Sequence, residues 1–177
     1  MGLFFDILSS INNPNQQGNV AQLESIMNTV NQLSATYGID ASQIQTVMSS
    51  VGNLIRPVLQ QNTSLTGGGG DNLLGQFMGA GGSAIALQSL LTPEIQQQMV
   101  QVINQTTGLS PNQIQAALPT LISTVMSLLN MGASKPGIQG GGNPLLNAFL
   151  DADKDGDADL GDVMKYAGRF LNPPQAA

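Results

Sequence analysis

An internal repeat is the feature that most constrains the fold of this chain. The segment YGIDASQIQTVMSSVGNLIRPVLQ, which starts at Tyr37, matches TGLSPNQIQAALPTLISTVMSLLN, which starts at Thr107, at an offset of 70 residues. Beyond the glycine-rich tracts the offset becomes 72, where GGGGDNLLGQF matches QGGGNPLLNAF. We place the two copies at residues 21–77 and 91–149. A match of this length predicts one supersecondary unit that is used twice.

The repeated unit has the apolar periodicity of a helix. Apolar residues recur three and four positions apart, which is typical of the buried face of an amphipathic helix. No segment shows the sustained alternation of a strand, so we predict an all-α protein with two tandem helical repeat units. The stripe consists of Ile44, Met48, Val51, Ile55, Val58 and Leu59 in the first copy and of Ile114, Leu118, Leu121, Val125, Leu128 and Leu129 in the second.

Both stripes begin with residues that cap helix N-termini. Ser110 is followed by a proline and then by Gln113. This order predicts a capping box, in which the serine and glutamine side chains satisfy backbone N–H groups reciprocally. Asp40 and Gln43 stand at the equivalent positions of the first copy. We therefore predict that a long helix begins at each of these places.

Glycine and proline mark the other helix boundaries. Gly38 and Gly108 stand where a preceding helix needs a left-handed residue after its last turn. Thr92, followed by a proline, predicts a further helix start. Pro57 and Pro119 fall inside the two apolar stripes, where proline removes a backbone hydrogen bond. We therefore expect each long helix to kink or to split at its proline.

The Met-Gly-Leu-Phe start, together with the two helical segments, resembles the YidB-like family of bacterial proteins, which are all-helical domains of unknown function. The resemblance covers roughly residues 1–150 and rests on hydrophobic pattern and capping residues. It implies an all-helical fold and a bacterial origin, and it brings no catalytic residues to this chain. We assign residues 1–142 to this helical domain, with the second repeat running on into the segment that follows.

Residues 151–162, DADKDGDADLGD, gather six aspartates into twelve positions. Calcium takes roughly six to eight oxygen ligands, and an EF-hand loop supplies them from positions 1, 3, 5, 7, 9 and 12, with glycine at position 6 for a sharp turn. Gly156 stands at position 6. A bound divalent cation would relieve the repulsion among the carboxylates, so we predict a metal site. The predicted ligands are Asp151, Asp153, Asp155, Asp157, Asp159 and Asp162.

The sequence on either side of this loop predicts two helices. Asn143 can cap a short helix that starts at Pro144, before the loop. After the loop, Lys165 and Arg169 lie toward the C-terminal end of a second helix, where its dipole favours cations. We expect this second helix to dock its apolar face onto the repeat core, with Val163, Tyr166, Ala167 and Phe170 on that face.

This helix–loop–helix resembles an EF-hand or the related calcium loop of dockerin modules. Asp162 replaces the bidentate glutamate that an EF-hand usually has at position 12, which weakens calcium binding and leaves Mg²⁺ as an alternative. Dockerin loops do have aspartate there. Ala158 replaces the branched apolar residue that pairs one hand with another, and the chain contains no second loop. We assign residues 143–171 to a single EF-hand-like motif and 172–177 to a flexible tail.

Composition excludes several functions. Five Lys and Arg residues provide no basic stripe for a phosphate backbone, so we expect no nucleic-acid binding. The chain contains no histidine and no cysteine, and its carboxylates outside the loop are scattered, so we predict no enzyme. Its longest apolar stretch is interrupted by Pro119, and its N-terminus lacks a basic segment. We therefore expect a soluble, cytoplasmic protein without a membrane span.

Two functional hypotheses follow from these observations. The first is a non-enzymatic calcium-binding helical protein, in which the metal orders the C-terminal helix–loop–helix and acts in a calcium response or in structure. The second is a self-associating scaffold or interaction protein, a homo-oligomer or the partner of another protein, in which the cation is only structural. Charged residues make up only 9% of the chain, so electrostatic repulsion between molecules is weak.

Overall fold

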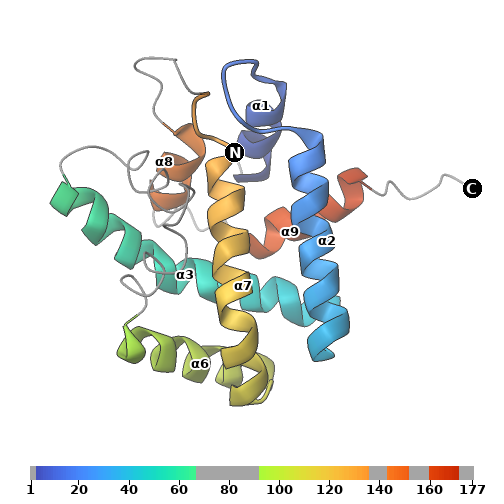
Figure 1. The fold of residues 1–177 in the computed structure, drawn as a ribbon, viewed down its shortest axis with the longest axis vertical. Helices are drawn as coiled ribbons and strands as arrows, with labels where there is room; N and C mark the ends of the chain where they lie inside the picture. Colours follow the sequence, from blue (N-terminus) through green and yellow to red (C-terminus); the bar gives the residue numbers. More distant parts are fainter. Residues whose placement is uncertain (1–2, 67–91, 136–142, 152–159, 172–177) are drawn as a thin grey trace, which may run out of the picture.

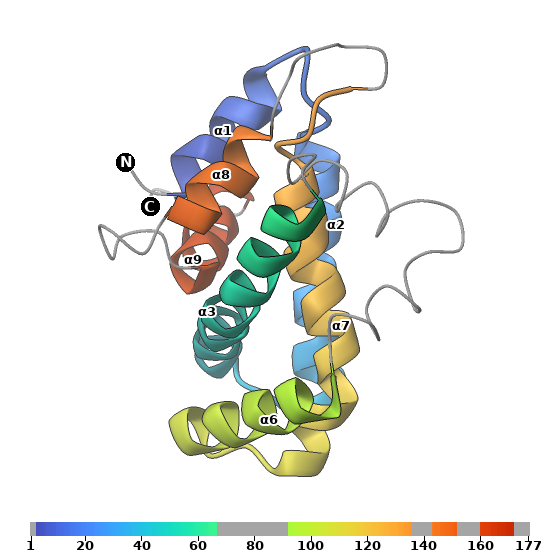
Figure 2. The same cartoon turned by 90° about the vertical axis from the view of Figure 1, so that its left-hand side faces the viewer.

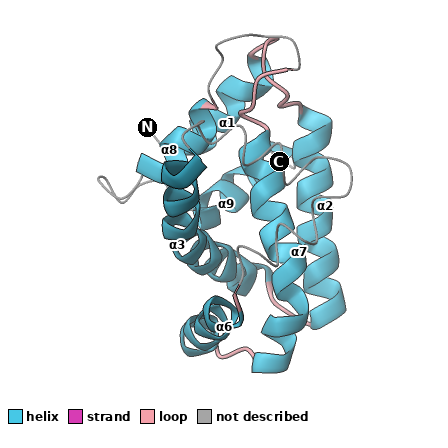
Figure 3. Ribbon diagram, turned by 60° about the vertical axis from the view of Figure 1, so that its left-hand side comes forward, coloured by secondary structure: helices cyan, strands magenta, loops and turns pink. Residues whose placement is uncertain are grey.

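A computed structural model describes residues 3–66, 92–135, 143–151 and 160–171 (Figure 1). These residues form helices and their connections, and no strand is drawn among them (Figure 3). One isolated antiparallel bridge joins Gln16 to Ser134. The prediction of an all-α protein is therefore confirmed. The helices are α1 (Leu3–Asn12), α2 (Val20–Tyr37), α3 (Ala41–Thr66), α6 (Pro93–Thr107), α7 (Pro111–Asn130), α8 (Pro144–Asp151) and α9 (Leu160–Leu171).

Helix α7 lies at the centre of the bundle. It packs beside α2 along its length, against α6 near its N-terminal end, and against α8 near its C-terminal end. Helix α3 crosses the bundle and contacts α6, α7, α8 and α9. Figure 2 shows α1, α8 and α9 grouped on one side of α3, with α6 below it. This arrangement explains why α7 buries most of its residues, whereas α6 buries only Met99 and Ile103.

The two helix pairs α2–α3 and α6–α7 have the same connection. Gly38 and Gly108 adopt positive φ angles of 63° and 72°, and the N–H group of each donates to a carbonyl of the last helical turn. The predicted left-handed C-caps are therefore confirmed. A further bond follows in each pair, because Ser34 Oγ donates to the Ile39 carbonyl and Asn104 Nδ2 donates to the Leu109 carbonyl.

Glutamines at the start of α3 and α7 connect the two pairs reciprocally. Gln43 Nε2 donates to the Thr107 carbonyl at 3.2 Å, and Gln113 Nε2 donates to the Tyr37 carbonyl at 2.9 Å. Each glutamine also accepts a backbone N–H at its own helix start, from Asp40 and from Ser110 respectively. Ser110 and Gln113 form the complete predicted capping box. Each helix start is thus attached to the C-terminus of the first helix in the other pair.

The prolines inside α3 and α7 do not split either helix. Helix α3 runs through Pro57, and α7 runs through Pro119. Both prolines are exposed, so the hydrogen bond that each one removes faces solvent. The apolar stripe on either side of each proline packs into the same core, and this packing keeps the helices continuous. The expected split is therefore wrong.

Candidate metal centre

The structure describes only part of the predicted calcium loop. Among the residues that it describes, no group of three or more acidic, histidine or cysteine residues could hold a metal. Asp162 lies in the first turn of α9 and is exposed. Asp151 is the last residue of α8, and its side chain is not described. The metal site stays a prediction, because Asp153, Asp155, Asp157 and Asp159 lie outside the described residues.

The helix before the loop is firmly attached to the core. The side chain of Asn143 is buried, and its Oδ1 accepts the backbone N–H of Leu146 at 2.9 Å. This bond confirms the predicted cap of α8. The Nδ2 of the same side chain donates to the Leu129 carbonyl, also at 2.9 Å. One amide therefore fixes the start of α8 to the end of α7, and the loop follows a helix of defined position.

Both ends of the loop lie against the same residue of α3. A Cβ atom at Gly52 would lie 2.6 Å from Leu160 Cδ1 and 3.5 Å from Phe149 Cε2. Phe149 stands near the end of α8, and Leu160 is the first residue of α9. The end of α8 and the start of α9 therefore lie close together. A side chain at this position would require Leu160 to shift, so glycine permits the close approach of α9.

The next turns of α3 bind the end of α8. The Arg56 guanidinium lies over the Phe149 ring, 4.9 Å from its centroid, in a cation–π contact. Gln60 Nε2 donates to the Leu150 carbonyl at 2.9 Å. Gln60 thereby supplies a donor to a carbonyl of the last turn of α8, at the negative end of its dipole. The residue that immediately follows Leu150 is Asp151, the first predicted ligand.

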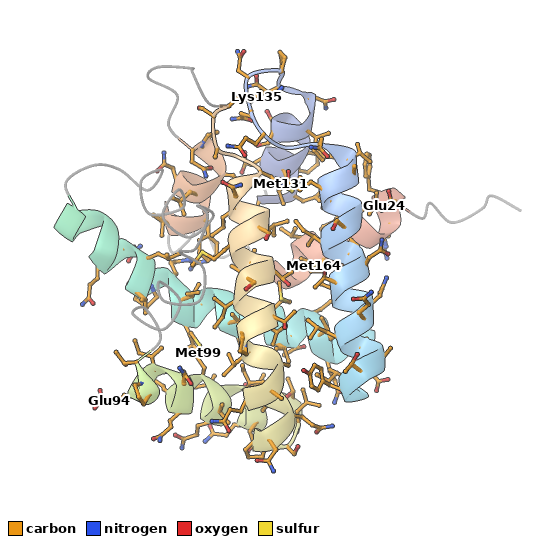
Figure 4. The ribbon with its side chains drawn as sticks, in the orientation of Figure 1. Glu24, Glu94, Met99, Met131, Lys135 and Met164 are labelled. Carbon is orange, nitrogen blue, oxygen red and sulfur yellow. The ribbon has the colours of Figure 1, made fainter. Side chains whose placement is uncertain are left out.

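The helix after the loop buries a different face from the one predicted. Val163 and Ala167 are buried as expected, whereas Tyr166 and Phe170 each keep 46% of their surface exposed. The reason is that α9 packs on α3 and α2, and this contact covers the face that contains Leu160 and Met164. Figure 4 shows Met164 on the interior side of α9. The prediction that all four residues share the buried face is therefore wrong.

Tyr166 and Phe170 instead join a surface cluster with α1, which we call the aromatic patch. The ring of Phe4 lies 5.5 Å from Tyr166, 6.5 Å from Phe170 and 6.2 Å from Phe5, measured between centroids. Phe5 is 61% exposed. The aromatic patch, defined as these four residues, was not predicted. The spacing of the two α9 aromatics could have suggested it, but only the fold brings α1 beside them.

Two grooves open elsewhere on the described surface. The larger, about 430 Å³, lies between α6 and α7, and most of its lining side chains are carboxamides, among them Gln97, Gln101 and Gln115. The smaller, about 230 Å³, lies between α2 and α7 and is lined mainly by serine and threonine hydroxyls. Neither lining contains an ionisable side chain, so neither groove offers a pair for acid–base chemistry.

Comparisons with protein-family models, with curated proteins and with solved structures find no match for this chain. Among the helices of the described residues, none is long and apolar enough to cross a membrane.

Proposed function

We propose that this is a non-enzymatic calcium-binding helical protein, whose residues 151–162 hold the cation in an EF-hand-like or dockerin-like loop. The observation that carries the proposal is the ligand spacing of six aspartates with Gly156 at the turn, placed between α8 and α9. The contacts of Phe149 and Leu160 with Gly52 support it, because they hold the two ends of the loop near one another.

The chemistry of the ligand set favours a hard cation. Carboxylates and a backbone carbonyl supply oxygen ligands, which calcium and magnesium both accept. The short side chain of Asp162 at position 12 weakens the bidentate contact that favours calcium. We therefore expect calcium to bind more weakly than in a loop that ends in glutamate, with magnesium as a competitor.

Cation binding would couple to the folding of α9. A ligand that binds only the folded state stabilises it by about 2.7 kcal/mol when its free concentration is 100 times Kd. In this protein the stabilised element is α9, which buries Leu160, Val163 and Ala167 against the core. The cation then either stabilises the contact of α9 with the core permanently, or controls this contact in response to the calcium concentration.

A calorimetric calcium titration in a millimolar magnesium background tests the proposal. We expect one site in the wild-type protein and none in Asp151→Ala, which removes the first ligand. Glu24→Gln removes the same charge from an exposed position on α2 and is expected to leave the titration unchanged (Figure 4). Equal calcium affinity in Asp151→Ala and in the wild type would contradict the proposal. Binding only at millimolar calcium would reduce the loop to a structural cation site.

The helical part is proposed to consist of two copies of one unit, α2–α3 and α6–α7, within a domain that resembles the all-helical YidB-like family. Their matched caps support this division, as do the reciprocal bonds of Gln43 and Gln113. In this proposal the copies form a domain over residues 1–142, to which the motif of residues 143–171 is attached.

Self-association is a second candidate function, in which the cation serves structure alone. The low charge of the chain supports it, and so does the exposed aromatic patch on α1 and α9.

A further inference from the structure

The aromatic patch concentrates residue types that are scarce in this chain. The protein has five phenylalanines and two tyrosines, and four of these seven residues form the patch. Phe5, Tyr166 and Phe170 are among the most exposed large apolar side chains of the described residues. Exposed apolar side chains that adjoin one another mark an interaction surface more strongly than the same residues scattered singly.

The outer face of α9 adds a row of charges beside the patch. Asp162, Lys165 and Arg169 are all exposed. Asp162 and Arg169 are seven residues apart, which places them on the same side of the helix, two turns or about 10 Å from one another. Tyr166 lies between them. The face therefore has an acid at one end, a base at the other and an aromatic residue at its centre.

We propose that a second copy of this chain covers the aromatic patch in a two-fold symmetric dimer, with α9 antiparallel to α9 of the second copy. A two-fold axis near Tyr166 brings Asp162 opposite Arg169 of the second copy, and the symmetry forms the same ion pair twice. The exposed rings of Phe5, Tyr166 and Phe170 are buried between the copies. Antiparallel packing also places the two helix dipoles in a favourable orientation.

A second copy fits this face better than an anionic surface does. Asp162 would be repelled by anionic lipids or by an acidic peptide, and so would a chain of net charge −6. A self-complementary face is what a closed symmetric dimer requires. The inference rests on the self-association candidate. Asp162 is also the last predicted calcium ligand, so the dimer is tested without calcium, where its carboxylate is available for the ion pair.

Sedimentation velocity of the full chain in excess EDTA, from micromolar to millimolar protein, tests the inference. We expect a reversible dimer of the 18.4 kDa chain. Replacing Tyr166 and Phe170 together by serine is expected to raise the dimer Kd at least about tenfold, because exposed rings in a symmetric interface are lost twice. Circular dichroism verifies that the variant keeps its helices.

A charge swap distinguishes a direct contact from a loss of folding. Arg169→Asp and Asp162→Arg are each expected to weaken the dimer about fivefold, since each change places like charges opposite one another at two symmetric positions. The double swap restores the opposite charges and is expected to restore the wild-type Kd. Lys135→Asp makes the same charge change as Arg169→Asp at an exposed position outside α9 and is expected to leave the dimer Kd unchanged.

Three results would overturn the inference. A protein that stays monomeric at every concentration would remove both the dimer and the self-association candidate. A dimer that is insensitive to the serine variant and to the charge swaps would leave self-association standing and would place its interface elsewhere. Binding to anionic vesicles by a chain that stays monomeric would assign the patch to a membrane surface instead.

Discussion

Helices α2 and α6 occupy corresponding places in their two pairs, yet they differ in what they bury. Helix α2 buries Leu23 and Ile26 in its first half, where the residues 70 positions later in α6 are Pro93 and Gln96. The second half of α2 contributes Val30 and Leu33 to the core. The corresponding half of α6 remains similar in sequence. The loss of buried apolar residues is therefore greatest in the first half of α6.

The partner of α2 explains this difference. Helix α9 packs on α2, and a Cβ atom at Gly168 would lie 3.6 Å from Met27 Cε. The residue that corresponds to Met27 in α6 is Gln97, which is exposed and lines the groove between α6 and α7. The face of α2 that α9 covers is apolar, whereas the corresponding face of α6 borders solvent and has uncharged polar residues.

The second helices of the pairs differ at one position for the same reason. Gly52 of α3 leaves space for Leu160 of α9, whereas Ile122, 70 residues later in α7, is fully buried and has a branched side chain at the corresponding position. Two helices with the same apolar stripe can thus bind different neighbours when one side chain is removed. Phe149 of α8 and Leu160 of α9 both approach α3 at this place.

Exchanging the corresponding residues of α2 and α6 is expected to have the largest effect. Ile26→Gln places a carboxamide at a position that is 5% exposed and removes buried apolar contacts, so we expect a loss of about 3 kcal/mol in the free energy of unfolding. The reverse change, Gln96→Ile, is expected to cost less than about 1 kcal/mol because Gln96 is only half-buried. Urea denaturation measures both, and equal losses would contradict the comparison.

Giving α3 the isoleucine of α7 is expected to displace α9. Gly52→Ile introduces a branched side chain where a single carbon already meets Leu160, so we expect a loss of about 2 kcal/mol in the free energy of unfolding. Asn53→Ile changes the neighbouring exposed residue and controls for helix propensity. Thermal unfolding measures the melting temperatures of both variants, and we expect that of Gly52→Ile to be lower. The same melting temperature for the two would argue against close packing at Gly52.

The reciprocal glutamines test whether the two pairs are equivalent. Gln43→Ala and Gln113→Ala each remove a bond to the other pair and a bond at the local helix start, so we expect each to cost about 1.5 kcal/mol. Gln98→Ala, at an exposed position of α6, serves as the control. Chemical denaturation should give equal losses for the two glutamines. A loss confined to one of them would show that the pairs are not equivalent.

The smallest effect is expected at the two helix ends. Gly38→Ala and Gly108→Ala each force a side chain into the left-handed region, at a cost of about 1 kcal/mol. No atom lies within 4 Å of a Cβ built at either glycine, so backbone strain is the whole cost and should be equal in both. Differential scanning calorimetry can resolve it. Unequal shifts in Tm would reveal a further contact in one pair.

Much of the helical part could be predicted from local chemistry. The caps at Asn143, Ser110 and Thr92 and the turns at Gly38 and Gly108 depend on residues within a few positions, so their signals are readable in sequence. The calcium ligands were also predicted from spacing alone. Most of them lie outside the described residues, and the calcium titration remains their test.

The face that α9 buries could not be predicted in the same way. Its sequence gives an apolar stripe wide enough to include Val163 and Ala167 as well as Tyr166 and Phe170. Periodicity states which residues share a helix surface, but it does not state which part of that surface meets a neighbour. The positions of α2 and α3 decided this, through Gly168 and Gly52.

The sequence by itself determined the all-helical character of the described residues and the starts and ends of most of their helices, and the spacing of its aspartates predicts a cation-binding loop. These features arise from interactions between residues that are close along the chain. Only the tertiary structure decided that the prolines leave α3 and α7 intact, that the glutamines link the two pairs, and that α1 meets α9 in an aromatic patch. These features depend on contacts between residues far apart in sequence, and packing sets them only when the whole core forms.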